Sequence, residues 1–161
     1  MSTGVFHIPG QSRGYRDDQR NGAGRVDLDQ AIAMSVNTYF YKLALDMGID
    51  RFSQWMSRFG FGRPTGIDLD GESSGVLPSR QWKRAQRSQA WYPGETVIAG
   101  IGQGYWVVTP LQLAHAVATL ANRGVPYRPH LLKAVQASGD GIRKPLPELP
   151  SGKSIGNTEA Q

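Results

Sequence analysis

The chain has 161 residues, no cysteine and a formal net charge of +5. Its hydrophobic fraction of 39% and mean hydropathy of −0.40 are those of an ordinary globular protein, and its length suffices for one domain with a hydrophobic core. The absence of cysteine excludes disulfides and thiolate metal sites.

No apolar run reaches the roughly 20 residues that cross a bilayer. Residues 1–6 lack the basic region and the long apolar segment of a secretory signal. We therefore expect neither a transmembrane segment nor a signal within this chain.

The basic residues are dispersed along the chain, and no nucleic-acid-binding motif accompanies them. Their densest group is Arg80, Lys83, Arg84 and Arg87. We interpret this group as a solvated helix face and expect no nucleic-acid partner. The histidines, His7, His115 and His130, are far apart in sequence, which argues against a histidine-based metal site.

The first third of the chain predicts a loop and a pair of helices. Residues 1–26 predict a loop with a short strand over 4–8. Asp27 or Asp29 then caps a short helix that buries Ile32 and Ala33. A second helix is predicted because apolar residues recur at the three- and four-residue spacing of one helix face, and Gly48 ends it. These residues are Phe40, Leu43, Ala44 and Met47.

Ser35-Val36-Asn37 is a polar tripeptide between these two helices. Ser and Asn are favoured N-cap residues, so one interpretation is plain capping of the second helix. The other is that the corner between two helices holds a hydroxyl and a carboxamide for chemistry. The tripeptide alone does not decide between them.

The middle of the chain alternates between helices and glycine-rich turns. A third helix is predicted from an Asp50 cap to Gly60. Its apolar face is Phe52, Trp55, Met56 and Phe59. Residues 66–69 fit an edge strand, and 79–87 predict a basic amphipathic helix whose Trp82 packs inward. Residues 93–96 predict a turn.

The glycine-rich stretch 100–104 places glycine at alternate positions, which lets backbone approach backbone or a ligand closely. It lacks the spacing of a dinucleotide-binding loop. Gly152-Lys153-Ser154 likewise lacks the earlier glycine and the strand of a phosphate-binding loop. We therefore expect no cofactor.

Thr109-Pro110-Leu111-Gln112 is the clearest helix start in the sequence. Thr109 is the N-cap, Pro110 occupies the first helical position and Gln112 completes a capping box. This helix is expected to be central and to end at Gly124. Its apolar face is Leu113, Ala114, Val117, Ala118, Leu120 and Ala121. A strand is predicted over 127–135, and residues 136–161 predict a flexible tail.

A set of ordered stretches together resembles one family. The stretches are Ser35-Val36-Asn37-Thr38-Tyr39-Phe40-Tyr41, Met47-Gly48-Ile49-Asp50, Phe59-Gly60-Phe61-Gly62, Thr65-Gly66-Ile67-Asp68-Leu69, Gly100-Ile101-Gly102-Gln103-Gly104-Tyr105-Trp106 and Thr109-Pro110-Leu111-Gln112. In this order they resemble the transpeptidase domain of class B penicillin-binding proteins, and within that class the elongation-specific peptidoglycan D,D-transpeptidases.

The resemblance implies an α+β fold of the penicillin-binding protein and serine β-lactamase type. It covers residues 1–135, which we expect to form a partial transpeptidase domain. This part would hold mostly the helical lobe, with a few short strands and an incomplete central sheet. The chain would thus be a central fragment of the domain.

The resemblance also implies serine acyl transfer, in which the Ser of an S-x-x-K motif attacks the penultimate D-alanine carbonyl of a stem peptide. Ser35 of the S-x-N motif would relay protons, and Asn37 would bind the substrate through an amide of its acyl chain. No Ser in the chain has Lys three places on, so the nucleophile is missing. We expect the chain alone to be inactive.

Two further features of the family are absent or altered in the sequence. The K-[ST]-G motif is represented at best by Lys153-Ser154, which is either a chance match or a degraded copy. Some members carry a structural zinc near S-x-N with Asp, His and Cys ligands. The corresponding positions here are Asp17, Ala23 and Val36, so we expect no metal.

For the intact parent, the resemblance implies stem peptides and β-lactams as ligands, a shape-determining glycosyltransferase as partner and a place at the periplasmic face of the inner membrane. An incomplete sheet would expose apolar surface, so we expect self-association. Two alternatives stay open. One is a non-catalytic remnant or interaction module that binds a cell-wall synthesis partner, and the other is a basic surface-binding protein unrelated to the cell wall.

Overall fold

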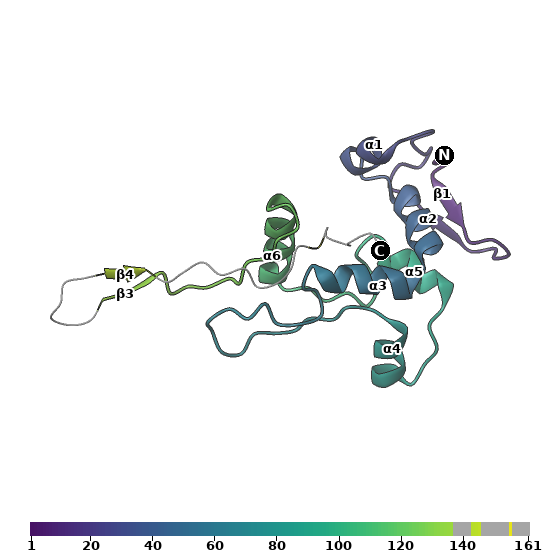
Figure 1. The fold of residues 1–161 in the computed structure, drawn as a ribbon. Coiled ribbons are helices and arrows are strands. Elements are labelled where there is room, and N and C mark those ends of the chain that lie inside the picture. Colours follow the sequence, from purple (N-terminus) through teal and green to yellow (C-terminus); the bar gives the residue numbers. More distant parts are fainter. Residues whose placement is uncertain (137–142, 146–154, 156–161) are drawn as a thin grey trace, which may run out of the picture. The chain divides into compact units, whose positions relative to one another are not determined.

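The computed structural model describes residues 1–136, 143–145 and 155 (Figure 1). The chain divides into two compact units. Unit 1 comprises Met1–Gln54 and Pro78–Trp106, and unit 2 comprises Trp55–Leu77 and Val107–Gln161. The helix α3 (Ile49–Arg58) contains the boundary between them.

Unit 1 begins with an antiparallel hairpin of β1 (Val5–His7) and β2 (Gly14–Arg16), in which Phe6 faces Tyr15. The helices α1 (Leu28–Ala33), α2 (Asn37–Met47), α4 (Arg80–Arg87) and α5 (Pro93–Ala99) follow, with the first part of α3 between α2 and α4. β1 confirms the strand predicted over 4–8. β2 was predicted as loop, because a three-residue strand gives too short a pattern to recognise.

The hairpin packs on α2 and α5 through a hydrophobic cluster. Its buried members are Ile8, Tyr15, Tyr41 and Val97. A second cluster in the same unit is formed by Ile49, Trp91 and Ala99, with Phe52 and Trp106 packed against it. Both clusters include residues of α5, so this short helix is the centre of unit 1.

The close approach of α2 and α5 depends on Gly100. A Cβ built at this position would lie 2.4 Å from the Cβ of Ala44 and 3.0 Å from the carbonyl oxygen of Phe40. The expectation that this glycine lets backbone approach backbone is confirmed. Gly102 serves a different purpose, since its φ of +74° is readily adopted only by glycine.

Unit 2 is built around α6 (Pro110–Ala121), which has the predicted Thr109 cap and capping box. The Gln112 side chain is buried and its Nε2 donates to the carbonyl oxygens of Arg63 and Ser74. This residue therefore fixes the loop 62–77 against the start of α6. The same loop also pairs with the residue after Trp106, through an isolated antiparallel bridge between Val76 and Val107.

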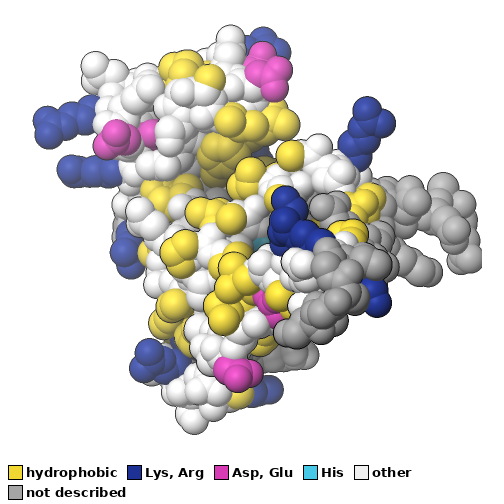
Figure 2. Space-filling view, turned by 90° about the vertical axis from the view of Figure 1, so that its left-hand side faces the viewer, with side chains coloured by type: hydrophobic (Ala, Val, Ile, Leu, Met, Phe, Trp, Pro, Cys, Tyr) yellow, Lys and Arg dark blue, Asp and Glu magenta, His cyan; other side chains and the backbone are white. Residues whose placement is uncertain are grey.

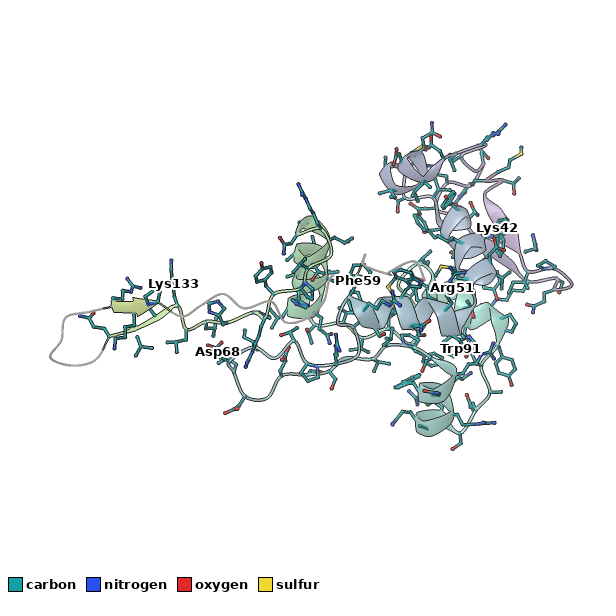
Figure 3. All side chains as sticks on the ribbon, viewed as in Figure 1. Lys42, Arg51, Phe59, Asp68, Trp91 and Lys133 are labelled. Atoms are coloured by element: carbon teal, nitrogen blue, oxygen red, sulfur yellow. The ribbon has the colours of Figure 1, made fainter. Side chains whose placement is uncertain are left out.

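A second clamp in unit 2 joins loop 62–77 to the segment after α6. Both carboxylate oxygens of Asp68 accept hydrogen bonds, from the amides of Leu131 and Leu132. Figure 3 labels Asp68 and, in the segment after α6, Lys133. The Arg128 side chain donates to the carbonyl oxygen of Gly66. The edge strand predicted over 66–69 is wrong, because the backbone there is held by side chains rather than by a neighbouring strand.

The strand predicted over 127–135 is shorter than expected. It is β3 (Ala134–Gln136), and it pairs with β4 (Arg143–Pro145) in an antiparallel ladder. The tail was predicted over 136–161, and apart from Gln136, β4 and Ile155 its residues lie outside the described part of the chain. The amide of Ile155 donates to the carbonyl oxygen of Gly124. The flexible tail stays a prediction.

Several helix details differ from the sequence-based expectation. α5 replaces the turn predicted at Pro93–Thr96. Asp50 lies inside α3 and pairs with Arg80 rather than capping the helix. Ile32 and Ala33, which were predicted to be buried, are exposed, whereas Ala31 is the buried residue of α1.

The apolar face of α6 is exposed in this structure. Leu113, Val117 and Leu120 are 55%, 57% and 63% exposed, while the buried residues of the helix are Gln112, Ala116 and Thr119. The helix is central to unit 2 as expected, but it ends at Ala121 rather than at Gly124, and its apolar face is not buried by the described residues.

The described strands form two separate two-stranded sheets among these helices. This arrangement confirms the α+β class with an incomplete sheet. No helix in the described ranges has the length and apolarity needed to cross a bilayer.

Candidate active site

The Ser35-Val36-Asn37 tripeptide lies in unit 1, in the turn between α1 and α2. The amide of Val36 donates to the carbonyl oxygen of Ala31, 2.9 Å away, which closes the end of α1. Ser35 has a φ of +53°, in the left-handed region that residues other than glycine rarely adopt. Such backbone conformations occur often at functional sites, where the surrounding structure enforces them.

The Ser35 hydroxyl is not used for capping. Val36 is the N-cap of α2 and Asn37 is its first helical residue, and no side chain within the tripeptide caps the helix. Ser35 is exposed and Asn37 is half-buried. Within the part of the chain that the structure describes, neither side chain makes a hydrogen bond, so the capping interpretation is wrong and both groups are available to a ligand.

Asp17 supplies the missing cap. Its Oδ2 lies 2.8 Å from the amide nitrogen of Thr38 and 2.8 Å from the Thr38 hydroxyl, which both donate to it. The side chain of Asp17 follows β2 and is buried, with 6% of the residue exposed. The carboxylate therefore closes the amino end of α2 directly beside Asn37.

Ser2 extends this network. The hydroxyl oxygens of Ser2 and Thr38 lie 2.7 Å apart, and the amide of Ala23 donates to the Ser2 hydroxyl. Ser2 can then donate to Thr38, which in turn donates to Asp17. The chain of polar groups connects the first residues, the segment after β2 and α2.

The environment of Asp17 favours its charged form. Burial by itself raises the pKa of the carboxyl group, but hydrogen bonds outweigh this effect and hold the pKa below its usual value. The donors are the amide and hydroxyl of Thr38, with the amides of Gln19 and Asn37. Burial, and then the charge of Asp17, raise the pKa of Tyr41.

A second buried charge lies between α4 and α5. Lys83 is 1% exposed, and its Nζ donates to Oε1 of Glu95. The ammonium group also lies 4.8 Å from the ring centre of Tyr92 and 5.6 Å from that of Tyr105. Burial lowers the pKa of Lys83, but the hydrogen bond and charge of Glu95 outweigh it and hold the pKa above its usual value.

Sequence reasoning missed this pair because Lys83 stands in a run of basic residues. The prediction that this run is a solvated face is wrong for Lys83, although its neighbours Arg84 and Arg87 are exposed. Trp82 contacts Tyr105, with ring centres 5.2 Å apart, as its predicted inward packing requires. The sequence Pro93-Gly94-Glu95 could have indicated the start of a helix, with Pro at its first position and Glu95 accepting from the amide of the N-cap residue Tyr92.

The basic side chains show no concentration on the face in Figure 2. They are scattered there among hydrophobic and uncharged side chains. The expectation of no nucleic-acid partner stays a prediction.

The family's zinc site does not fit the residues present. Of the corresponding positions, Ala23 and Val36 have no donor atoms, and Oδ2 of Asp17 is bonded to Thr38. In the described part of the chain, no cluster of three or more His, Cys, Asp or Glu side chains could hold a metal ion. Lys153-Ser154, predicted as either a chance match or a degraded copy of the K-[ST]-G motif, lies outside the described residues.

Comparison with known proteins identifies the family. Residues 4–159 match the family described as the penicillin binding protein transpeptidase domain. The chain belongs to this family.

Curated proteins of known sequence include similar members of this family. The transpeptidase-domain chain is 47% identical over 148 residues to the peptidoglycan D,D-transpeptidase MrdA of Salmonella typhimurium. The match covers 92% of the chain and 23% of MrdA. The chain therefore spans about a quarter of the length of this relative.

Solved structures agree with this assignment. The transpeptidase-domain chain is similar to penicillin-binding protein 2 (PBP2) of Pseudomonas aeruginosa in complex with WCK 5153, with 48% identity and a TM-score of 0.80. That match covers 92% of the chain and 32% of PBP2. It is also similar to PBP2 in the complex with MreC from Helicobacter pylori, with 32% identity, a TM-score of 0.76 and coverage of 89% and 26%.

Proposed function

We propose that the chain is the central part of a peptidoglycan D,D-transpeptidase of the PBP2 type, which cross-links stem peptides by serine acyl transfer. Ser35 relays protons to and from a nucleophilic serine, and Asn37 binds the amide of the acyl chain. The observation that carries this proposal is the exposed, left-handed Ser35 two residues before the half-buried Asn37, in a chain of this family.

The chemistry needs groups that the chain does not contain. A serine hydroxyl attacks a carbonyl only when a base removes its proton, and here no Ser has Lys three places on. The isolated chain is therefore inactive, and β-lactams acylate only a protein that supplies the nucleophile and the other wall of the cleft.

The partners follow from the same assignment. The substrate is a peptidoglycan stem peptide, and a shape-determining glycosyltransferase supplies the strands to be cross-linked. The PBP2 of H. pylori forms a complex with MreC, which supports a place for this protein in a cell-wall synthesis assembly. The intact protein works at the periplasmic face of the inner membrane.

A chimera tests the proposed function. The chain replaces the matching 148 residues of S. typhimurium MrdA, and a fluorescent penicillin labels the product. We expect labelling of the chimera and none of the isolated chain. Ser35→Ala should slow labelling of the chimera by about 100-fold or more, as for the loss of a proton-transfer group. Asn37→Ala should also slow labelling, because it removes the group that binds the amide of the acyl chain.

Gln103→Ala is the control, because Gln103 is exposed in the same unit and is assigned no role. Labelling of the isolated chain would refute its predicted inactivity. Equal labelling rates for the chimera and its Ser35→Ala variant would refute the assigned role of Ser35.

The second candidate is a non-catalytic interaction module. The exposed apolar face of α6 favours it, since large apolar side chains in contact with water mark binding surfaces. Under this hypothesis the chimera folds but stays unlabelled, and the isolated chain binds a cell-wall synthesis protein such as MreC. Labelling of the chimera decides for the transpeptidase.

A further inference from the structure

The amino end of α2 is capped from a distant part of the chain. Its own N-cap, Val36, has no polar side-chain atom, and the first turn of the helix contains no acidic residue. Most helices are capped by Ser, Thr, Asp or Asn at the N-cap position itself. Here the carboxylate that accepts from Thr38 belongs to Asp17, 21 residues before it.

We propose that Asp17 is a positioning residue for the Ser35-Val36-Asn37 motif: its carboxylate caps α2 and thereby fixes the backbone that presents Ser35 and Asn37. The proposal rests on the proposed function, in which these two side chains act on the substrate and the nucleophile. Asp17 acts through its hydrogen bonds to the amino end of α2, chiefly those from Thr38.

The strength of the cap follows from charge and burial. A carboxylate at a helix amino end interacts favourably with the unpaired amides and with the helix dipole. Hydrogen bonds to an ionised group are stronger than those between neutral groups, and the low dielectric of a buried site strengthens them further. Asp17 meets both conditions, since it is buried and accepts two hydrogen bonds from Thr38.

The segment that holds Asp17 is itself fixed. The amide of Asp17 donates to the carbonyl oxygen of Gly4, 2.8 Å away, beside the β1–β2 hairpin. One residue earlier, the carbonyl oxygen of Arg16 accepts from the hydroxyl of Tyr41 in α2. The hairpin and α2 are therefore joined by the Tyr41 hydrogen bond as well as by the carboxylate itself, so a displacement of Asp17 would displace the start of α2.

The backbone at Ser35 needs this support. A non-glycine residue at positive φ persists only where neighbouring contacts enforce it. On one side the Val36 amide is bonded to α1, and on the other Thr38 is bonded to Asp17. If the second contact is removed, the turn keeps the bond to α1, but on the other side Thr38 keeps only its contact with the neutral Ser2 hydroxyl.

The first experiment measures amide hydrogen exchange in the 161-residue chain by NMR at fixed pH. In Asp17→Ala the Thr38 amide should exchange about tenfold faster or more, as for the loss of a hydrogen bond to a charged group. Asp17→Asn should give a smaller effect, because the carboxamide oxygen still accepts. Asp18→Ala is the matched control and should match the wild type, since Asp18 is exposed.

The amide of Val97, which belongs to the fully buried core, reports whether each variant is folded. In Asp17→Ala its exchange should accelerate by less than that of the Thr38 amide, and in Asp18→Ala it should match the wild type. Unchanged exchange at Thr38 in Asp17→Ala would overturn the proposal.

The second experiment measures the acylation rate of the MrdA chimera by a fluorescent penicillin. Asp17→Ala should slow acylation about tenfold, Asp17→Asn less, and Asp18→Ala not at all. This order, with partial rescue by Asn, distinguishes positioning from a general loss of stability, which the Val97 amide measures separately.

The two proposals fail in different ways. If Ser35→Ala slows acylation and Asp17→Ala does not, the positioning role is wrong and the proposed function stands. If Ser35→Ala and Asn37→Ala both leave acylation unchanged, the proposed function is wrong, while hydrogen exchange still decides whether Asp17 orders the motif.

Discussion

Lys83 is a buried cation whose partners all lie in unit 1. Its ion pair with Glu95 is enclosed by the rings of Tyr92 and Tyr105. Removing one member of such a pair leaves the other charge buried without a partner, which destabilises a protein more than removing both.

We therefore expect Lys83→Met to lower the free energy of unfolding strongly, and Lys83→Met combined with Glu95→Gln to lower it by less than the sum of the two single effects. Arg84→Met is the control, because Arg84 is exposed on the same helix. Urea denaturation of the four variants measures the coupling. Additive effects would show that the pair contributes nothing as a pair.

Asp17 predicts a pH dependence of stability. The pKa of its carboxyl group is lower in the folded state than in the unfolded chain, so the folded state binds this proton less readily. The stabilisation is fully present above the unfolded value, 3.8, and is lost as pH falls through the folded-state pKa. Tyr41, the titratable neighbour on α2, stays protonated throughout this range because its pKa is raised.

Urea denaturation between pH 6 and pH 2 should show a steeper loss of stability in the wild type than in Asp17→Asn. Asp68 and Glu72 also have lowered pKa values and contribute to the slope in both proteins. The difference between the two curves therefore belongs to Asp17. Parallel curves would contradict the prediction.

The residues of the candidate site could be found from sequence only in part. Ser35 and Asn37 follow from the order of the motifs, because the motif is local. Asp17 as the cap of α2 could not be found, since 21 residues separate it from Thr38 and no spacing rule links a cap to so distant a helix. Lys83 was misassigned because its burial depends on Glu95 of α5 and on the rings of Tyr92 and Tyr105, which flank that helix in the sequence.

At the scale of elements, α2 and α5 meet where a side chain would not fit. We expect Gly100→Ala to destabilise the chain by about 1–3 kcal/mol, because the new methyl group overlaps Ala44. Adding Ala44→Gly removes that methyl and should restore part of the loss. The control is Ala44→Gly alone, which costs about 1 kcal/mol through helix propensity.

Chemical denaturation of these variants gives the coupling between positions 44 and 100. The contact would be contradicted if the double variant lost as much unfolding free energy as the two single variants together, or more. The Phe40 carbonyl oxygen limits the recovery, since it also lies within 3.0 Å of the added atom.

Elements with strong local signals were predictable. The start of α6 was correct to the residue, because Thr109, Pro110 and Gln112 are all local cues. β2 and α5 were missed, since a three-residue strand and a seven-residue helix have almost no periodicity. The loop at 66–69 was misassigned because the Asp68 clamp is a tertiary contact that replaces strand pairing.

For the whole molecule, the exposed face of α6 predicts self-association. Its apolar side chains Leu113, Val117 and Leu120 are solvent-exposed in a chain that spans about a quarter of the MrdA relative. Burial of such a surface against a second copy is favourable by about 25 cal/mol per Å² of apolar area. We expect the wild type to associate at micromolar concentrations.

Leu113→Glu combined with Leu120→Lys should shift the chain towards monomer, as measured by sedimentation equilibrium. Gln81→Glu is the control, because it adds a charge to an exposed position of α4. A monomeric wild type over the whole concentration range would contradict the expectation.

The link between Asp17 and α2 also orders events in folding. The hydrogen bonds inside α2 join residues four apart and form early, whereas the bond to Asp17 first requires closure of a 21-residue loop. The cap then forms late, after the main barrier to folding. Loss of Asp17 should consequently accelerate unfolding and leave the folding rate nearly unchanged.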